Sequence, residues 1–362
     1  MPRQFACVVG ARPNFAKMDA VLRGLKMYPE IQPVLVHTGQ HYSEQLSGVM
    51  LKDLGMKQPG VNLNVGPGDF GQQTGRIIEQ FSKFLKQHQP FERVVVVGDV
   101  TSTVAATLAA ANIGLPVAHV ESGLRSFDRQ MPEEVNRIVT DSLSDMLFAT
   151  ESKAVENLLW EGHPEDKIHL VGSTMIDGML RLLPTVDLRH NGYSPNVPYG
   201  VVTIHRPSNV DSQKSLTAII DMIEAASKHI QLLFPIHPRT FDNAKRFGLL
   251  DCLTGIVGLK LLPALGYLDF LGLLCQATVV ITDSGGIQEE TTVLDVPCLT
   301  TRKNTERPIT VTQGTSTLVD SSTTKLCNEL ESILNGTYKK GDCPKLWDGH
   351  SGERIAKILA QS

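Results

Sequence analysis

Short apolar runs alternate with longer amphipathic stretches along most of the chain. The runs are rich in β-branched residues and are continuous, which is typical of strands in a parallel sheet that is covered on both faces. We predict eight strands in this way: Phe5–Val9, Val34–Thr38, Arg93–Val97, Val117–Val120, Met146–Ala149, Gly200–Ile204, Gln231–Phe234 and Thr278–Ile281. The stretches between them have the length of helices, so the pattern predicts an α/β fold.

The predicted strands form two series, and the segment between them lacks a regular pattern. This segment, Leu182 to Tyr199, contains several helix and strand breakers: Pro184, Asn191-Gly192, Pro195 and Pro198. With 362 residues the chain has room for roughly two domains. We therefore expect two Rossmann-like domains, residues 1–175 and 176–351, whose parallel sheets face each other across a cleft. A final amphipathic helix, residues 352–362, is a candidate to pack back on the first domain.

Composition and charge narrow the class of ligand. The net charge of −4 and the absence of a dense Lys/Arg run argue against a nucleic-acid partner. An apolar run long enough for a membrane span or a signal peptide is also missing from the sequence, so we expect a cytoplasmic protein with no membrane partner. The six cysteines are scattered without zinc-binding spacing, which is typical of free thiols. We expect a small-molecule ligand, no metal and no cofactor.

The segment ITDSGGIQEE, Ile281 to Glu290, is the most informative part of the chain. An apolar strand leads into Ser284, Gly285 and Gly286, and a polar helix start follows directly. Adjacent glycines let the backbone approach a ligand closely, and the N–H groups and positive dipole end of the helix favour a phosphate. Arg307, in the segment TERP, could add a charge-assisted hydrogen bond to the same anion.

Polar residues also follow the other predicted strands, where α/β proteins bind their ligands. The first half of the chain supplies the carboxylates Asp99, Glu121 and Glu133, and the second half supplies His205 and His237. Carboxylates near a sugar can act as acids or bases, while cations and helix N–H groups suit a diphosphate. This division predicts a nucleotide-sugar site.

Most of these residues also have a structural interpretation. Asp99 could cap the helix that follows it, and Glu133 after Pro132 fits an ordinary first helical turn. Lys17 would usually be a solvated side chain, and a lone histidine such as His237 is as often structural as functional. Glu121, between an apolar strand and a glycine, is the hardest to explain by packing.

Eight motifs span nearly the whole chain: GARPNFAKM (10–18), TGQHY (38–42), GDVTST (98–103), HVESGLRS (119–126), MPEEVNR (131–137), HRPSN (205–209), SGGIQEE (284–290) and TERP (305–308). In this order they resemble the non-hydrolysing UDP-N-acetylglucosamine 2-epimerase family. The resemblance implies the GT-B arrangement of two Rossmann-like domains and a homodimer. It also implies reversible conversion of UDP-N-acetylglucosamine to UDP-N-acetylmannosamine, through elimination of UDP to 2-acetamidoglucal and its readdition.

The resemblance also implies roles for individual residues. Asp99, Glu121, Glu133 and His205 match the catalytic positions, and which carboxylate takes the C2 proton stays open. Residues at positions that hold UDP are Arg12, Lys17, Ser284, Gly285, Gly286, Glu290 and Arg307. Among these, Glu290 would bind the ribose hydroxyls. Phe270 falls where the family's uracil pocket lies, and His237 is a further candidate for substrate binding.

Some features depart from the family pattern and leave alternatives open. Ser208 stands where the motif HRxEN has Glu, and TGQHY and GQQTG (71–75) lack the Arg-rich versions of members that need substrate as an allosteric activator. We therefore expect no strong allosteric requirement. The alternatives are a hydrolysing 2-epimerase that releases N-acetylmannosamine and UDP, a 2-epimerase of a related UDP-2,3-diacetamido sugar, and a GT-B glycosyltransferase. A catalytically silent sensor is disfavoured because all four candidate catalytic residues are present.

Overall fold

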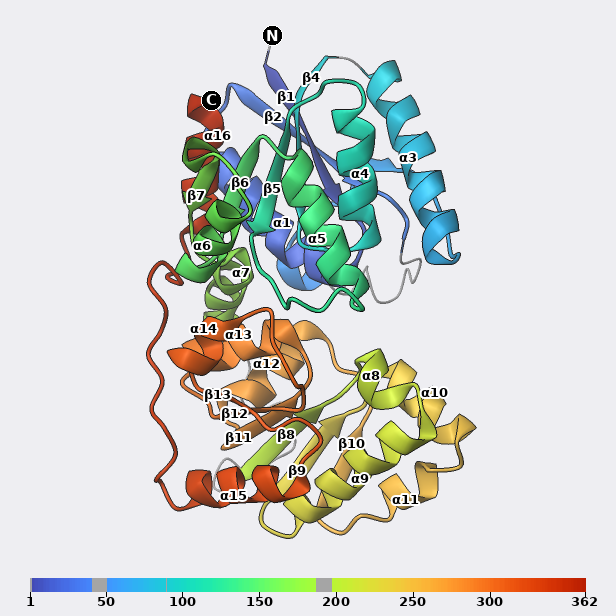
Figure 1. Cartoon of the computed structure of the whole chain (residues 1–362), viewed down its shortest axis with the longest axis vertical. Helices are drawn as coiled ribbons and strands as arrows, with labels where there is room; N and C mark the ends of the chain where they lie inside the picture. Colours follow the sequence, from blue (N-terminus) through green and yellow to red (C-terminus); the bar gives the residue numbers. More distant parts are fainter. Residues whose placement is uncertain (1, 41–50, 89, 187–196) are drawn as a thin grey trace. The chain divides into compact units, whose positions relative to one another are not determined.

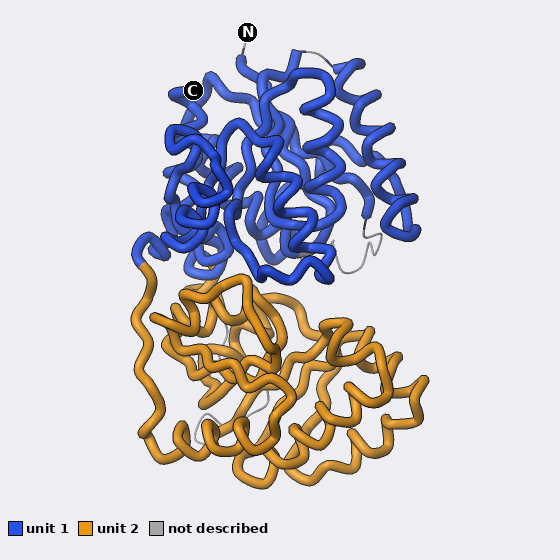
Figure 2. Tube along the Cα trace, in the orientation of Figure 1, with its two compact units in different colours: residues 1–181, 345–362 blue, residues 182–344 orange. Residues whose placement is uncertain are grey.

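The computed structural model describes residues 2–40, 51–88, 90–186 and 197–362 (Figure 1). The chain divides into two compact units, residues 1–181 with 345–362 and residues 182–344 (Figure 2). It therefore leaves the first unit once and returns to it near the C-terminus. Each unit is a parallel sheet with helices, which confirms the predicted α/β class.

Among the described residues, the first unit has seven parallel strands in the order β3-β2-β1-β4-β5-β6-β7. The strands are β1 (Arg3–Val9), β2 (Ile31–His37), β3 (Val61–Asn62), β4 (Phe91–Val97), β5 (Val117–Ser122), β6 (Met146–Ala149) and β7 (Ile168–Leu170). The helices are α1 (Arg12–Leu25), α3 (Phe70–Gln87), α4 (Thr101–Ala111), α5 (Pro132–Leu143), α6 (Ser152–Trp160), α7 (Thr174–Leu182) and α16 (Ser351–Gln361), with the 3₁₀ helix η1 (Glu165–Lys167).

The sheet of the second unit has six parallel strands in its described part, in the order β10-β9-β8-β11-β12-β13. The strands are β8 (Tyr199–Thr203), β9 (Gln231–Pro235), β10 (Leu259–Leu262), β11 (Val279–Thr282), β12 (Cys298–Thr300) and β13 (Ser316–Leu318). The helices are α8 (Pro207–Val210), α9 (Gln213–Ser227), α10 (Pro238–Arg246), α11 (Leu250–Thr254), α12 (Tyr267–Cys275), α13 (Gly285–Val293), α14 (Pro308–Thr312) and α15 (Thr323–Leu334), with the 3₁₀ helix η2 (Leu183–Thr185).

All eight predicted strands are present, and β8 shows why their sequences are continuously apolar. Val202 packs into a core cluster with residues of α9 and α15, while its neighbour Val201 packs on the other face with residues of α12. Successive strand residues point to opposite faces, so a strand covered on both sides needs apolar residues at every position. Burying one such side chain contributes about 1.5–3 kcal/mol. The strands outside the prediction are short or interrupted: β3, β7, β12 and β13 have two or three residues, and the apolar run of β10 is broken by Lys260.

Each sheet has a point where the strand order reverses. In the first unit the reversal lies between β1 and β4, and in the second it lies between β8 and β11. Ligands of open parallel sheets bind outside the carboxyl ends of the strands at such points. The residues there are Asp99 after β4, His205 after β8 and Asp283 after β11. The topology therefore puts candidate residues of both units at the expected positions.

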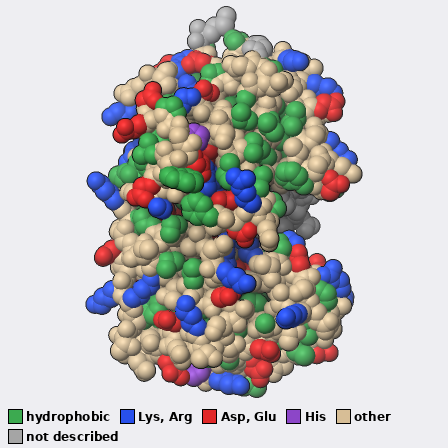
Figure 3. Space-filling model, viewed as in Figure 1, with side chains coloured by type: hydrophobic (Ala, Val, Ile, Leu, Met, Phe, Trp, Pro, Cys, Tyr) green, Lys and Arg blue, Asp and Glu red, His purple; other side chains and the backbone are tan. Residues whose placement is uncertain are grey.

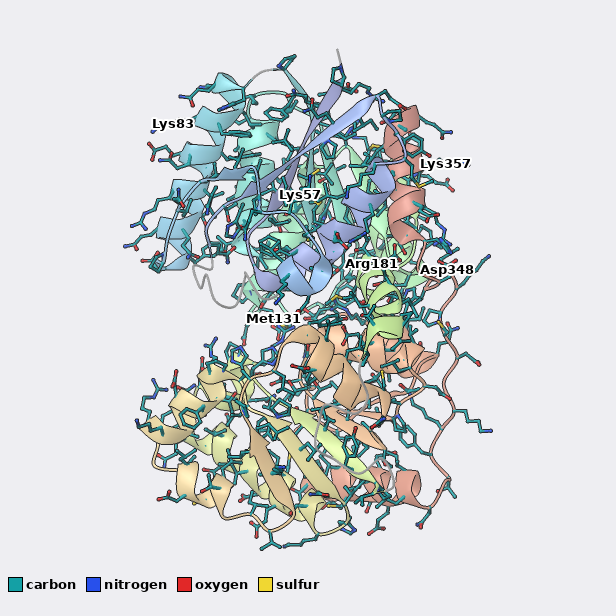
Figure 4. The ribbon with its side chains drawn as sticks, turned by 180° about the vertical axis from the view of Figure 1, so that it is seen from behind. Lys57, Lys83, Met131, Arg181, Asp348 and Lys357 are labelled. Atoms are coloured by element: carbon teal, nitrogen blue, oxygen red, sulfur yellow. The ribbon has the colours of Figure 1, made fainter. Side chains whose placement is uncertain are left out.

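The C-terminal helix α16 packs directly against α1 in the first unit (Figure 1). Two glycines allow the close approach: a Cβ atom on Gly352 would lie 2.2 Å from the carbonyl oxygen of Ala20, and one on Gly24 would lie 2.3 Å from that of Gly352. The backbone N–H of Gly352 also donates to Oδ2 of Asp177 at 2.7 Å. Lys357, labelled in Figure 4, is on the exposed side of α16.

One face of the molecule shows how the charged side chains are distributed. On the face drawn in Figure 3, Lys and Arg side chains are interspersed with Asp and Glu, and no large area carries one sign. Within the described chain, each helix is too short or too polar to cross a bilayer.

We predict that Gly352→Ala lowers the free energy of unfolding by about 1–3 kcal/mol, because the new methyl group would overlap the backbone of α1. Gly75→Ala is the matched control: Gly75 lies in α3 with nothing within 4 Å of the added methyl group. Removing a helical glycine there should raise stability by about 0.5–1 kcal/mol. Urea unfolding of both variants measures the difference. Equal stabilities would contradict the tight α1–α16 contact.

Candidate active site

Glu121, at the end of β5, has the most constrained backbone of the candidate carboxylates. Its φ of 70° lies in the left-handed region, which costs a non-glycine residue about 1–3 kcal/mol. The register between β5 and β6 shifts at this point, so a bulge redirects the side chain. The carboxylate is 2% exposed, and its Oε2 lies 2.5 Å from Nζ of Lys17. Lys17 is thus buried and ion-paired, and its interpretation as a solvated side chain is wrong.

Asp99 is held by α5. Its carboxylate pairs with Arg137, a fully buried side chain, and its backbone carbonyl accepts a hydrogen bond from Nδ2 of Asn136 at 2.9 Å. The N-cap residue of α4 is Val100, and no side-chain cap is present there. The observed contacts of Asp99 therefore join the end of β4 to α5.

The two glutamates of the MPEEVNR motif have different environments. Glu134 is buried and accepts hydrogen bonds from the backbone N–H of Ser126 at 2.8 Å and of Phe127 at 3.0 Å. These hydrogen bonds hold the loop between β5 and α5 against the first turn of α5. The loop ends at Met131, the residue labelled in Figure 4. Glu133 is less buried, because neighbouring helical residues point in different directions. The sequence interpretation named Glu133 and passed over Glu134.

A buried charged network lies behind these carboxylates. The two ring nitrogens of His119 lie 2.6 Å from Oδ1 of Asp141 and 2.8 Å from the carbonyl oxygen of Gly98. Oδ2 of Asp141 accepts from the N–H of Gly123 at 3.0 Å and from Arg125 at 2.7 Å. Burial acts to raise the pKa of Asp141, but His119 and Arg125 outweigh it and lower the pKa. The network thus fixes the backbone beside both Asp99 and Glu121.

In the second unit, Asp283 organises the HRPSN segment. The carboxylate is fully buried and accepts hydrogen bonds from the N–H of His205 at 3.0 Å, the N–H of Arg206 at 2.8 Å and Nδ2 of Asn209 at 3.0 Å. The ring of His205 stacks on that of His237, with centroids 5.2 Å apart. Ser208, which replaces the family's Glu, is exposed on α8.

The turn Ser284-Gly285-Gly286 begins helix α13, as the sequence predicts. Arg307 lies over this turn: a Cβ atom on Gly285 would lie 2.5 Å from its Nη1. The guanidinium is buried and pairs with Glu289. Helix N–H groups and a fixed cation therefore occur together, which is the arrangement that an anion such as a phosphate requires.

Glu290, on α13, is buried and accepts a hydrogen bond from the hydroxyl of Tyr267 at 2.8 Å. Burial raises the pKa of Glu290 to about 7, against the opposing effect of the Tyr267 hydrogen bond, and nearby Glu289 raises it further. Tyr267 was not among the predicted residues, although it begins the same helix as Phe270. Phe270 is half-buried on α12 beside the core of the second unit.

The remaining candidates are less informative. His237 is exposed and caps α10, where its Nδ1 accepts from the N–H of Arg239 at 3.1 Å. Arg12 begins α1, but its side chain lies outside the described part, as do the last two residues of TGQHY.

Glu306, in the TERP motif, is buried. Burial acts to raise its pKa, but Arg302, Arg206 and Arg307 hold the pKa well below the usual range.

The sequence profile of the UDP-N-acetylglucosamine 2-epimerase family matches residues 23–360. The chain belongs to this family. It is 40% identical over 366 residues to the UDP-N-acetylglucosamine 2-epimerase of Methanocaldococcus jannaschii, with 98% of each chain covered. It is 34% identical over 357 residues to the UDP-2,3-diacetamido-2,3-dideoxy-D-glucuronate 2-epimerase of Pseudomonas aeruginosa, again with 98% of each covered.

Solved structures of the epimerase family have the same fold. The crystal structure of the M. jannaschii UDP-GlcNAc 2-epimerase in complex with UDP-GlcNAc and UDP superposes with a TM-score of 0.91 at 39% identity. The match covers 99% of this chain and 100% of that one. The epimerase fold is therefore present from end to end.

We predict that Glu290 makes the protein less stable as the pH rises from about 4.5 to about 7. In this range the unfolded chain has lost the Glu290 proton while the folded protein retains it, so unfolding releases a proton and becomes easier. The loss should reach at most about 3 kcal/mol. Urea unfolding of the wild type and Glu290→Gln across this range measures it, because only the wild type carries this term. Glu224→Gln, on the exposed side of α9, is the control. The prediction would be refuted if the free energy of unfolding of the wild type and of Glu290→Gln changed with pH in the same way.

Proposed function

We propose that the protein interconverts UDP-N-acetylglucosamine and UDP-N-acetylmannosamine by epimerisation at C2, without releasing free sugar. The observation that carries this proposal is the set of carboxylates at the strand ends of the first unit. Asp99 and Glu121 are each ion-paired with a cation of the same unit, Arg137 and Lys17. Such pairing holds the carboxylates in fixed positions, as acid–base chemistry on a sugar requires.

In the proposed mechanism the second unit holds the UDP moiety. The N–H groups of Gly285 and Gly286 and the hydroxyl of Ser284, with Arg307, bind the diphosphate. The N–H of Ser284 itself donates to Oγ1 of Thr282 at 2.9 Å. Glu290 accepts hydrogen bonds from the ribose hydroxyls, the role that the family resemblance implies for it. Its carboxylate already accepts from the hydroxyl of Tyr267, at the start of α12, at 2.8 Å. Phe270 contacts the uracil ring, and Arg12, Lys17 and His237 complete the set of proposed binding residues.

The chemistry explains why several carboxylates are needed. The C2 proton has no neighbouring carbonyl group, so its removal must be coupled to cleavage of the C1–O bond. UDP leaves with the bonding electron pair, a carboxylate takes the C2 proton, and 2-acetamidoglucal is formed. UDP then adds back to C1 while a proton is delivered to the opposite face of C2. Asp99, Glu121 and Glu133 supply the acid, base and charge-stabilising groups, and His205 acts at the diphosphate side of the reacting centre.

Proton NMR in deuterated water tests the proposal with UDP-N-acetylglucosamine as substrate. We expect deuterium at C2 and UDP-N-acetylmannosamine as the product. Free N-acetylmannosamine with UDP would instead establish a hydrolysing 2-epimerase. If UDP-N-acetylglucosamine is inert, the UDP-2,3-diacetamido uronate is the next substrate, because the 34% identical P. aeruginosa relative is a 2-epimerase of that sugar.

We predict that Glu121→Gln lowers kcat by about 10²- to 10⁴-fold, the usual contribution of a positioned acid or base. The affinity for UDP should change far less than kcat, since most of the proposed UDP contacts lie in the second unit and Lys17, the partner of Glu121, is a minority contribution. Glu156→Gln is the control, because Glu156 is an exposed residue of α6 that pairs with Lys153. Steady-state kinetics and calorimetric titration with UDP give the two readouts. A variant with wild-type kcat would remove Glu121 from the mechanism.

We also propose a homodimer, on the basis of the family resemblance. Sedimentation equilibrium of the purified protein tests this: a mass of one chain over the micromolar range would contradict it.

A further inference from the structure

Arg137 on α5 is a fully buried cation that faces a partly exposed carboxylate. Its Nη2 donates to Oδ2 of Asp99, whose side chain is 21% exposed. Asp99 follows β4 at the point where the strand order of the first unit reverses, which is where open parallel sheets bind their ligands. A ligand at this point can therefore reach Asp99 but not the arginine that holds it.

The guanidinium of Arg137 is also held by the loop that follows β5. Its Nη1 donates to the carbonyl oxygen of Leu124 at 3.2 Å and to Oε2 of Glu134 at 3.4 Å. The oxygens of Glu134 accept in addition from the N–H groups of Ser126 at 2.8 Å and Phe127 at 3.0 Å. Glu134 therefore cannot shift with the guanidinium without losing these hydrogen bonds, and the positive charge has a fixed position.

The backbone of Asp99 is fixed independently of its side chain. Its carbonyl oxygen accepts from Nδ2 of Asn136 at 2.9 Å, and the preceding carbonyl oxygen, that of Gly98, lies 2.8 Å from Nε2 of His119. With the backbone held in this way, rotation about the side-chain torsions is the freedom that remains to the carboxylate. The contact with Arg137 removes that freedom.

A guanidinium suits this task better than an ammonium group would. It keeps its charge at every physiological pH, and its planar fork fixes the direction of a carboxylate as well as its distance. A positive charge nearby also favours the ionised form of a carboxylate. If Asp99 took up a proton, Arg137 would lose a counter-charge while staying buried, which is costly. Asp99 is therefore suited to remain an anion while positive charge develops on a bound sugar.

We propose that Arg137 is a positioning residue for the chemical step, because it holds the carboxylate of Asp99 in one orientation and keeps it ionised. Arg137 does not touch the substrate and acts through Asp99. The inference rests on the proposed function, since it concerns the same carboxylate. It adds that a buried residue outside the set of substrate contacts sets the rate of epimerisation.

Arg137→Lys tests the proposal, with steady-state epimerisation of UDP-N-acetylglucosamine as the readout. Lysine keeps the charge but has no fork, so the carboxylate loses its fixed direction. We expect kcat to fall by about 10- to 100-fold, since a displaced catalytic group can cost about two orders of magnitude. KM should change far less, because losing an interaction that acts only in the transition state lowers kcat and kcat/KM together. A folded variant with wild-type kcat would overturn the proposal.

A double-mutant cycle separates this role from a purely structural one. Asp99→Asn removes the charge through which Arg137 acts. Adding Arg137→Lys to Asp99→Asn should therefore change kcat by no more than about twofold, the usual scatter of such cycles. If the two losses multiply instead, Arg137 acts apart from Asp99 and the proposal is wrong.

Arg354→Lys is the matched control. Arg354 on α16 is another arginine of the first unit that pairs with an aspartate, Asp348, and it donates to the backbone carbonyl of Val171 at 3.0 Å. This variant should keep the wild-type kcat. A loss as large as that of Arg137→Lys would mean that weakening any such arginine slows the enzyme, and it would overturn the proposal.

A paired replacement covers the case in which Arg137→Lys does not fold. Asp99→Asn combined with Arg137→Met removes both charges together, so neither is left buried without its partner. Its kcat should equal that of Asp99→Asn alone, and a larger loss would overturn the proposal. The proposed function fails separately: a wild type that epimerises no UDP-sugar would refute that function and this inference, whereas an active wild type with an equally active Arg137→Lys would refute the inference alone.

Discussion

Pairing of buried carboxylates with buried cations is the interaction on which the candidate site depends. Removing one member of such a pair typically costs about 3–5 kcal/mol, because an uncompensated charge stays buried. Glu121 has Lys17, Asp141 has Arg125 and Glu289 has Arg307, while the half-buried Asp99 has the buried Arg137. Glu290 differs from these ion-paired carboxylates. Its described hydrogen bond comes from the neutral hydroxyl of Tyr267, and its pKa is raised to about 7.

The pairs also connect elements that are distant in sequence. Lys17 is on α1 and Glu121 is at the end of β5, while Arg137 on α5 reaches back to the end of β4. Helix α1 is in turn held by α16, through glycine contacts with the last helix of the chain. The return of the C-terminus to the first unit therefore supports the helix that carries Lys17.

Two buried carboxylates, Asp283 after β11 and Asp141 on α5, fix backbone segments of the candidate site. Asp283 accepts three N–H donors and shapes the segment that carries His205, and Asp141 does the same for the backbone beside Glu121. Neither was among the predicted site residues, although Asp283 stands inside the motif ITDSGG. A buried Asp directly after an apolar strand is a usable signal, because such a group must find several donors to remain in the interior.

The sequence by itself determined eight of the strands, the α/β class and the turn that begins α13. These follow from local causes: a strand covered on both faces must be continuously apolar, and a glycine-rich turn before a helix exposes N–H groups. Tertiary structure alone decided that Lys17 is buried against Glu121, that Glu134 accepts from the loop beside Glu133, and that Asp283 holds the backbone of His205. Each of these depends on which groups the fold brings together, many residues apart for Lys17 and Glu121 and across a folded loop for Glu134. The resulting desolvation and pairing of charges has no counterpart in local sequence pattern.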